Sequence, residues 1–261
     1  MKTDFNAFIG VWPYWENKYA DPAGGGLVKL MDRNGIGRSV TVSLKAVFDD
    51  VKAGNLETFA ACERYKGRLV PAVTVDPFSP ENDAGYLREC YARGARVIKL
   101  YPVYHTYIAY LNGGGDLDRL METGAGIGFA FCLPIRLLMN WGFAAIPAAD
   151  AAAFADRYRE CKLAIDNANY SELTAVTEAA KRNQNVYVGT ASETMYNGIE
   201  FLIDAVGEDR VIGGTAAPLQ YPACGIVKIE KAGISGAAKE KLLGGNCERL
   251  LGLCGGEFDD R

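Results

Sequence analysis

Short runs of β-branched and aromatic residues alternate along the chain with segments whose apolar positions recur at helical spacing. The runs have the length of buried strands, and the segments between them have the period of amphipathic helices. Seven predicted strands are residues 4–12, 68–76, 95–103, 127–134, 162–167, 185–190 and 210–218. The segment 39–48 is predicted as a further strand that leads into a loop. The predicted helices are residues 56–65, 84–94, 116–126, 148–161, 171–183, 195–207 and 237–253.

This alternation predicts about eight strand–helix units at a spacing of roughly 30 residues. Right-handed crossovers then allow either an open doubly wound sheet or a closed barrel. The first strand is not followed by Gly-x-Gly-x-x-Gly, which favours the barrel. The Gly-rich segments 24–29 and 112–116 lack phosphate-loop spacing, so we interpret them as loops. We therefore predict an α/β protein, a single-domain (β/α)8 TIM barrel over residues 1–253, with a polar tail at residues 254–261.

Composition narrows the classes of function. Hydrophobic residues make up 49% and charged residues 23% of the 261 positions, as in ordinary globular proteins. The formal net charge is −4 and there is no basic run, so we expect no nucleic-acid partner. The sequence shows no signal segment and no apolar run long enough to span a bilayer. We accordingly expect a cytoplasmic protein without a membrane partner.

The cysteines and the histidine restrict the chemistry further. Seven cysteines stand at wide spacings without a Cys-x-x-Cys pair, which argues against a disulfide framework and a structural zinc site. We interpret most of them as reduced, buried small side chains. His105 is the only histidine, which excludes every mechanism that needs two imidazoles.

Three segments in the second half carry a family resemblance. They are NVYVGTASE at 185–193, VGEDRVIGGTAAP at 206–218 and KEKLLGGNCERLLGL at 239–253. Together they resemble the amidohydrolase-related family, a (β/α)8 barrel group of the metal-dependent hydrolase superfamily, and the resemblance extends over the whole chain. It implies metal ligands at the carboxyl ends of the strands: a His-x-His pair on the first strand, one His each on the fifth and sixth, and an Asp on the eighth.

The residues at those positions differ from the family's ligands. The His-x-His pair falls on Asn6 and Phe8, within DFNAFIG, and the other ligands fall on Cys132, Asn167 and Ala216. A divalent transition-metal ion prefers imidazole or carboxylate donors, and the Cys132 thiolate is the one strong zinc donor in this set. One thiolate does not make a site. We therefore predict no metal and no other cofactor. The missing Asp commonly serves as the family's general base, so ordinary metal-dependent hydrolysis does not transfer to this chain.

Polar side chains nevertheless remain at the predicted mouth of the barrel. By strand alternation Lys99 and Tyr101 share one face of the fourth strand, and His105 follows in the next loop. We predict Lys99 and His105 as catalytic residues, because a buried lysine can act as a nucleophile and a histidine can transfer protons. The alternative for His105 is a packed, hydrogen-bonded side chain.

Further polar side chains at strand ends suit a carboxylate ligand, because neutral donors together with Arg and Lys bind carboxylates well. The predicted substrate-binding residues are Asn6, Tyr101, Arg136, Asn167 and Thr190. Asp166, Ser192 and Thr215 also lie at strand ends. The alternative is that these groups hydrogen-bond one another and buried water in the space that a metal would occupy.

Aromatic and apolar loops surround the same predicted mouth. WPYW at 12–15 and VYHTYIAY at 103–110 predict an aromatic cluster, which either lines a pocket for a ring-bearing ligand or buries a subunit interface. The apolar loop 140–149 is our candidate for a homodimer contact or a pocket lid. A loop packed on its own barrel is the alternative.

Two hypotheses of function follow. In the first, the protein is a metal-free amidohydrolase-like barrel that binds a small carboxylate-bearing molecule at its mouth and acts as a hydrolase or lactonase through a new set of residues. In the second, it is a catalytically inactive barrel that serves as a binding or partner subunit. The resemblance does not decide between them, because one fold supports many functions.

Overall fold

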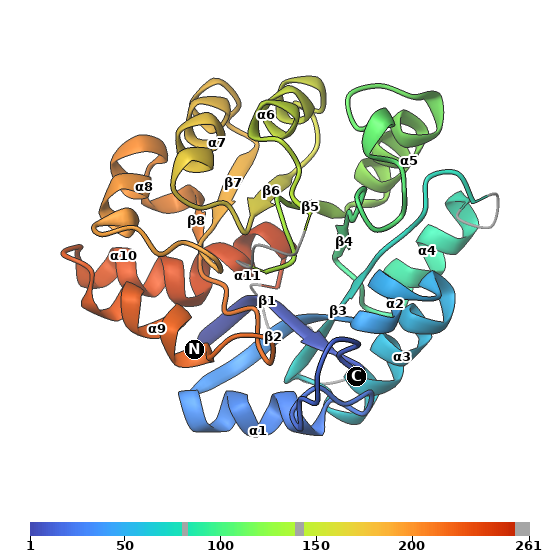
Figure 1. The fold of residues 1–261 in the computed structure, drawn as a ribbon, viewed down its shortest axis with the longest axis horizontal. Coiled ribbons are helices and arrows are strands. Elements are labelled where there is room, and N and C mark those ends of the chain that lie inside the picture. The colour runs from blue at the N-terminus through green and yellow to red at the C-terminus, as the bar shows by residue number, and fades with distance from the viewer. Residues whose placement is uncertain (80–82, 139–143, 254–261) are drawn as a thin grey trace.

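The computed structural model describes residues 1–79, 83–138 and 144–253, and it shows one ring of parallel strands surrounded by helices (Figure 1). The strands pair in chain order within one eight-stranded sheet. They are β1 (Lys2–Ile9), β2 (Ile36–Ser43), β3 (Leu69–Val73), β4 (Val97–Lys99), β5 (Ala130–Pro134), β6 (Leu163–Asp166), β7 (Val186–Gly189) and β8 (Val211–Ile212).

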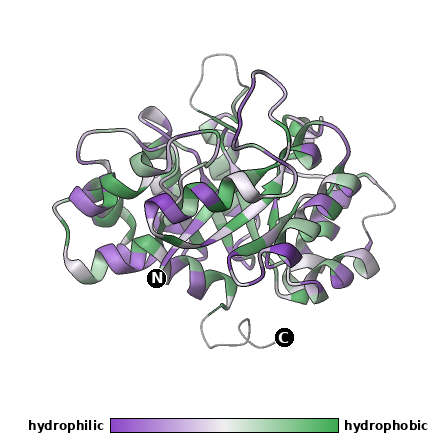
Figure 2. Cartoon of the chain, turned by 90° about the horizontal axis from the view of Figure 1, so that it is seen from below, coloured by the Kyte–Doolittle hydropathy of each residue, from purple (hydrophilic) through white to green (hydrophobic). Residues whose placement is uncertain are grey.

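Helices follow the strands and cover the outside of the ring. They are α1 (Gly25–Asn34), α2 (Leu44–Phe48), α3 (Val51–Arg64), α4 (Ala84–Ala92), α5 (Gly115–Ile127), α6 (Ala148–Arg157), α7 (Ser171–Arg182), α8 (Gly198–Val206), α9 (Pro222–Lys231), α10 (Gly236–Glu240) and α11 (Asn246–Leu251). In Figure 2 the outer helices carry both hydrophilic and hydrophobic residues, as amphipathic helices do. No helix of the described residues is long and apolar enough to cross a membrane.

Backbone hydrogen bonds close the barrel between β1 and the residues that follow β8. Phe5 N donates to Gly213 O at 3.1 Å, and Ala216 N donates to Asn6 O at 2.8 Å. Phe8 N donates to Ala217 O at 2.7 Å. The predicted TIM barrel is therefore confirmed, and the strands run parallel so that all their carboxyl ends meet at one mouth.

The interior and the outer layer of the barrel are filled by separate sets of side chains. Inward-facing residues of successive strands, such as Val42, Ala72, Cys132 and Ala164, form one buried cluster. Outward-facing residues of β4 to β8 pack with the surrounding helices in a larger cluster. Lys99 also points into the barrel, from β4, and is a charged side chain among inward-facing apolar ones.

The structure corrects two element predictions. The segment 39–48 leads from a strand into a helix and not into a loop: β2 ends at Ser43, whose Oγ accepts from Lys45 N at 3.1 Å and caps α2. The glycine-rich segment 24–29 is not a loop, since it opens α1. A Cβ at Gly26 would overlap the backbone of Tyr19, so a glycine there permits a close packing contact.

Some sequence predictions fall on residues outside the described part of the chain. The tail 254–261 does so entirely, and the apolar loop 140–149 does so at residues 140–143. The homodimer contact and the lid therefore stay predictions. The cysteines of the described residues are all free, and every one except Cys224 is buried, as expected.

Candidate functional site

Two buried charges of opposite sign meet at the mouth of the barrel. Lys99 is the last residue of β4 and Asp166 is the last residue of β6, and both are 0% exposed. The side-chain amide of Asn6, from β1, lies between them. Lys99 Nζ donates to Asn6 Oδ1 at 3.0 Å, and Asn6 Nδ2 donates to Asp166 Oδ2 at 2.8 Å. We call these three residues the Lys99–Asn6–Asp166 network.

The orientation of the Asn6 amide follows from these partners. An ammonium can only donate and an ionised carboxylate can only accept, so the amide must present its oxygen to Lys99 and its nitrogen to Asp166. A leucine at the same position would leave both charges without this bridge. The position of Asn6 therefore couples β4 and β6 across the barrel.

Backbone groups hold the Asp166 carboxylate from the other side. Its Oδ1 accepts from Asn167 N at 2.8 Å and from Ala191 N at 3.4 Å. Gly189 at the end of β7 leaves the space for this carboxylate, because a Cβ there would overlap Asp166 Oδ1. Several donors to one carboxylate favour its ionised form and offset part of the cost of burial.

Asn167 extends the network towards β7. It adopts a left-handed backbone conformation with φ of 58°, which asparagine tolerates better than most residues. Its Oδ1 accepts from Asn6 Nδ2 at 3.3 Å and from Ser192 Oγ at 3.2 Å. Its Nδ2 donates to the backbone oxygens of Arg136 at 2.8 Å and Leu137 at 3.1 Å. The side chain is thereby fully engaged by the protein.

Burial shifts the titration of both charged groups towards their neutral forms. Burial lowers the pKa of Lys99, while the carboxylates of Asp166 and Asp4 act in the opposite direction. Burial also raises the pKa of Asp166, against the stabilising effects of Asn167 N–H and the Lys99 charge. Each charge thus depends on the other, which makes the pair sensitive to removal of one partner.

Three hydroxyl groups of residues that follow β4 and β7 are buried without a hydrogen-bond partner among the described residues. They belong to Tyr101, Tyr104 and Thr190. Lys99 uses one of its three N–H donors on Asn6 in the bonds described above. Buried donors and acceptors without protein partners are usually satisfied by water or by a ligand, so this region has capacity for a small polar group.

An aromatic cluster connects this region to the surface, as predicted from the sequence. Ring centroids are 5.8 Å apart between Tyr14 and Phe48, 5.2 Å between Phe48 and Tyr104, and 6.4 Å between Tyr104 and Tyr101. Tyr14 is exposed and Tyr101 is buried, so the rings form a continuous series from solvent to the network.

Two of the predicted site residues, His105 and Arg136, make their side-chain contacts away from the network. The imidazole of His105 faces α2, with Nε2 at 3.0 Å from Ala46 O, and burial lowers its pKa. This geometry makes Nε2 the protonated nitrogen, because a carbonyl oxygen only accepts. The guanidinium of Arg136 is paired with Glu172 and is therefore already neutralised. The catalytic role of His105 and the ligand role of Arg136 stay predictions.

The structure also shows buried charges that the sequence did not indicate. Asp4 Oδ1 accepts from Thr215 N at 2.9 Å and from Asn6 N at 3.0 Å, and Thr215 Oγ1 donates to Asp4 Oδ2 at 2.5 Å. Burial raises the pKa of Asp4 to about 6. Lys228 of α9 donates to the backbone oxygens of Thr190 and Glu193. No local sequence pattern predicts these contacts, because the residues that form them come together only when the barrel closes.

The donor set does not fit a divalent metal ion. Ala216 has no donor, the Asn6 amide is engaged by Lys99 and Asp166, and the Phe8 ring centroid lies 5.3 Å from Lys99 Nζ. A lysine ammonium at this place would repel a cation. Among the described residues, no group of three or more His, Cys, Asp or Glu side chains is placed to hold a metal.

The barrel carries its buried polar network at the carboxyl ends of the parallel strands. This is the end at which α/β-barrel proteins have their functional sites. The chain belongs to the amidohydrolase family, whose model matches residues 13–253. A search of curated proteins found no match.

Solved structures share the fold at low sequence identity. An uncharacterised TIM-barrel protein, Bb4693 from Bordetella bronchiseptica, is 17% identical with a TM-score of 0.73, over 96% of this chain and 98% of that one. The 5-carboxyvanillate decarboxylase LigW from Sphingomonas paucimobilis is 13% identical with a TM-score of 0.73 over the same shares. A dihydroxybenzoic acid decarboxylase from Polaromonas sp. JS666, with bound manganese and the inhibitor 2-nitroresorcinol, is 15% identical with a TM-score of 0.74, over 100% and 99%.

Gly189→Ala is expected to disturb the network directly. The added methyl group overlaps Asp166 Oδ1, so we expect a loss of about 1–3 kcal/mol in the free energy of unfolding. Gly126→Ala is the matched control, because its Cβ meets nothing within 4 Å on an exposed turn of α5 and should stabilise by about 0.5–1 kcal/mol. Urea unfolding of the two variants checks this, and equal stability would contradict the close packing at Gly189.

Proposed function

We propose that the protein binds a small carboxylate-bearing molecule at the barrel mouth, with the Lys99 ammonium as the positive charge that a carboxylate needs. The proposal is carried by a buried lysine that uses one of its donors on the Asn6 amide, and by the buried hydroxyls of Tyr101 and Thr190, which have no hydrogen-bond partner among the described residues. A buried ammonium binds an anion strongly, because little water competes for either charge.

The aromatic cluster supports a ring-bearing carboxylate. Rings from Tyr14 to Tyr101 offer the edges and faces against which another ring can pack. Two structural neighbours are decarboxylases named for carboxyvanillate and dihydroxybenzoic acid, which are ring carboxylates. Those names describe the neighbours, and the proposed substrate class of this chain rests on the aromatic cluster and on Lys99.

For catalysis we propose metal-independent hydrolysis of a lactone or ester, with Asp166 as the proton acceptor. A water oxygen attacks the carbonyl carbon while Asp166 takes a proton from that water, and Lys99 faces the developing oxyanion. The bond between carbonyl carbon and ring oxygen then breaks, and the proton passes from Asp166 to the departing alkoxide. The carboxylic acid that results loses its remaining proton to solvent. The products are therefore a carboxylate, an alcohol and a released proton, and the carboxylate would occupy the same charge site.

The second candidate, a catalytically inactive binding or partner subunit, is favoured by one observation. Four buried residues are linked in series by hydrogen bonds, as expected of a network that only stabilises the barrel. They are Lys99, Asn6, Asp166 and Asn167. The two candidates differ in turnover and in ligand binding, so both can be measured.

Calorimetric titration with benzoate tests ligand binding. We expect benzoate to bind, and benzamide, which has the same shape without the charge, to bind at least about tenfold more weakly. A Lys99→Met, Asp166→Asn double variant removes both charges together and should lose benzoate binding while it stays folded. Equal affinities for benzoate and benzamide would contradict the role of Lys99.

Hydrolysis of dihydrocoumarin, followed in a pH-stat, tests turnover. We expect Asp166→Asn to lower kcat by about 10²–10⁴-fold, the usual contribution of a general base. Circular dichroism of the variant serves as the control for folding. Benzoate binding without any lactone hydrolysis by the wild type would leave the inactive binding barrel as the function.

A further inference from the structure

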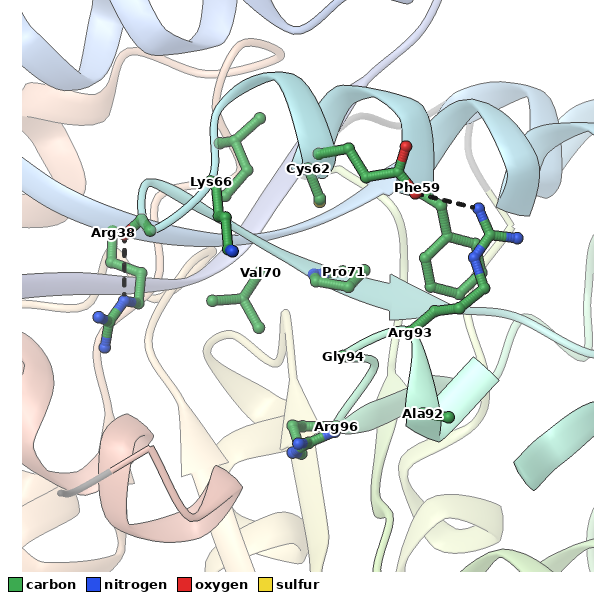
Figure 3. Close-up of a pocket in the computed structure, with 13 residues that line it drawn as sticks. Arg38, Phe59, Cys62, Lys66, Val70, Pro71, Ala92, Arg93, Gly94 and Arg96 are labelled. Atoms are coloured by element: carbon green, nitrogen blue, oxygen red, sulfur yellow. Dashed lines mark hydrogen bonds and ion pairs between the residues drawn. The ribbon is translucent and has the colours of Figure 1, made fainter. Parts of the chain in front are cut away.

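A cavity of about 450 Å³ opens at the end of the barrel opposite the mouth (Figure 3). It is lined by α3, by the first residues of β3, and by the turn that leads from α4 into β4. Parallel strands all run towards the mouth, so the starts of β3 and β4 mark the other end. The cavity is therefore separate from the Lys99–Asn6–Asp166 network.

The pairing of the strands explains why the barrel is open here. β3 pairs with β2 from Leu69 onwards, but it pairs with β4 only at Ala72 and Val73. Pro71, which has no backbone N–H to donate, is the last residue before the pairing with β4 begins. β3 and β4 therefore diverge towards their amino-terminal ends, and Pro71 lines the cavity between them.

The cavity concentrates positive charge in an acidic protein. Four cationic side chains and one acidic side chain line it: Arg38, Lys66, Arg93, Arg96 and Glu63. The formal charge of this lining is +3, four minus one, whereas the whole chain carries −4. A recess lined mainly by one sign of charge attracts small ions of the opposite sign.

Arg93 and Arg96 are held in place by contacts with aromatic rings and with neighbouring oxygen atoms. The Arg93 guanidinium lies 4.1 Å from the Phe59 ring centroid and 3.5 Å from Glu63 Oε1. Arg96 lies 4.2 Å from the Tyr91 ring centroid, and its Nη1 donates to Tyr91 O at 2.9 Å. Arg93 Nη1 also lies 4.0 Å from Glu89 Oε1, and Arg96 Nη1 also donates to Ala95 O at 3.0 Å. Stacking on a ring fixes the plane of each guanidinium group at the wall of the cavity.

The other two cations complete the ring around the cavity. Arg38 Nε donates to Gly67 O at 3.4 Å, and Nη1 lies 3.9 Å from Glu248 Oε1. In the part of the chain that the structure describes, Lys66 forms no ion pair, and its side chain extends towards β3 in Figure 3. Neither contact of Arg38 is a close bidentate pair, so its charge is only partly compensated.

Apolar side chains form the remaining wall. Phe59, Cys62, Leu69, Val70 and Pro71 line the cavity alongside the cations. We propose that this cavity binds a small phosphate monoester whose alcohol part is an apolar ring. The guanidinium and ammonium groups bind the phosphate dianion, and the apolar wall packs against the ring.

Calorimetric and ³¹P NMR titration with phenyl phosphate tests this proposal. We expect phenyl phosphate to bind more tightly than inorganic phosphate, because only the former covers the apolar wall. Lys66→Gln should weaken binding about fivefold by removing one nearby charge, and Glu63→Gln should strengthen it to a similar extent. Arg64→Gln is the control, since Arg64 is an exposed residue of the same helix outside the cavity lining.

Lys66 and Glu63 are exposed, so neither substitution is expected to affect folding. Unchanged affinity in both variants would overturn the proposal, and so would inorganic phosphate binding as tightly as phenyl phosphate. The Lys99→Met, Asp166→Asn double variant should bind phenyl phosphate like the wild type. Loss of binding in that variant would place the ligand at the mouth and contradict a second site.

Discussion

Lys99→Met is expected to lower the free energy of unfolding by about 3–5 kcal/mol, the usual effect of leaving a buried charge without its partner, here joined to it through the Asn6 amide. The substitution leaves the Asp166 carboxylate buried with backbone N–H groups and the Asn6 amide but without its cation. Methionine fills nearly the same volume, so the loss would come from charge and not from a cavity. Chemical denaturation measures it, and Lys231→Met, at an exposed position of α9, is the matched control.

Adding Asp166→Asn to Lys99→Met should restore most of the lost stability. Without the ammonium, the Asn6 amide is free to turn over, so that its oxygen accepts from the new amide. Replacement of a whole buried ion pair by neutral groups is often neutral or stabilising. If the double variant were as unstable as Lys99→Met alone, the two charges would not be coupled through Asn6, and the network as described would be wrong.

Asp4→Asn is expected to change the pH dependence of stability. Burial raises the pKa of Asp4 from 3.8 to about 6, so the folded state binds more protons than the unfolded state between these values. Stability contributed by this carboxyl group is therefore present below about pH 4 and is lost as the pH rises to about 6. The loss amounts to about 3 kcal/mol for a shift of roughly two pKa units.

The asparagine variant should lack this loss, because it does not titrate and its oxygen can still accept from Thr215 N and Asn6 N. Unfolding curves at pH 4 and pH 7 for wild type and variant give the difference directly. Asp204→Asn, at an exposed position, should leave the wild-type pH dependence intact. A parallel pH dependence of wild type and Asp4→Asn would show that Asp4 is ionised at little cost in the folded protein.

The sequence predicted the barrel because strand and helix periods repeat regularly, and that pattern depends only on neighbouring residues. It missed α1 because glycines there suggest a loop, whereas the fold needs them for close contact with Tyr19. The eighth predicted strand, 210–218, shortens to Val211–Ile212, although the residues after it still hydrogen-bond to β1.

The site was predictable where strand alternation or motif register sufficed. Alternation placed Lys99 and Tyr101 on the inward face, and the first-strand motif placed Asn6 at the mouth. Register alone could not distinguish the roles of neighbouring residues at the end of β6. The register predicts Asn167 as the site residue at this strand end. The charged residue that is linked to Lys99 through Asn6 is Asp166, and Gly189 of β7 leaves room for its carboxylate. Such complementarity between distant residues has no local signal.

We propose that Lys99 supplies the positive charge at this mouth in place of a metal. Plasma mass spectrometry of protein purified without chelator tests it most directly. We predict less than about a tenth of an equivalent of manganese, zinc, iron, nickel or cobalt. A content near one equivalent that falls on substitution of Asn6 or Asp166 would contradict the claim, because it would place a metal ion where the structure has the ammonium.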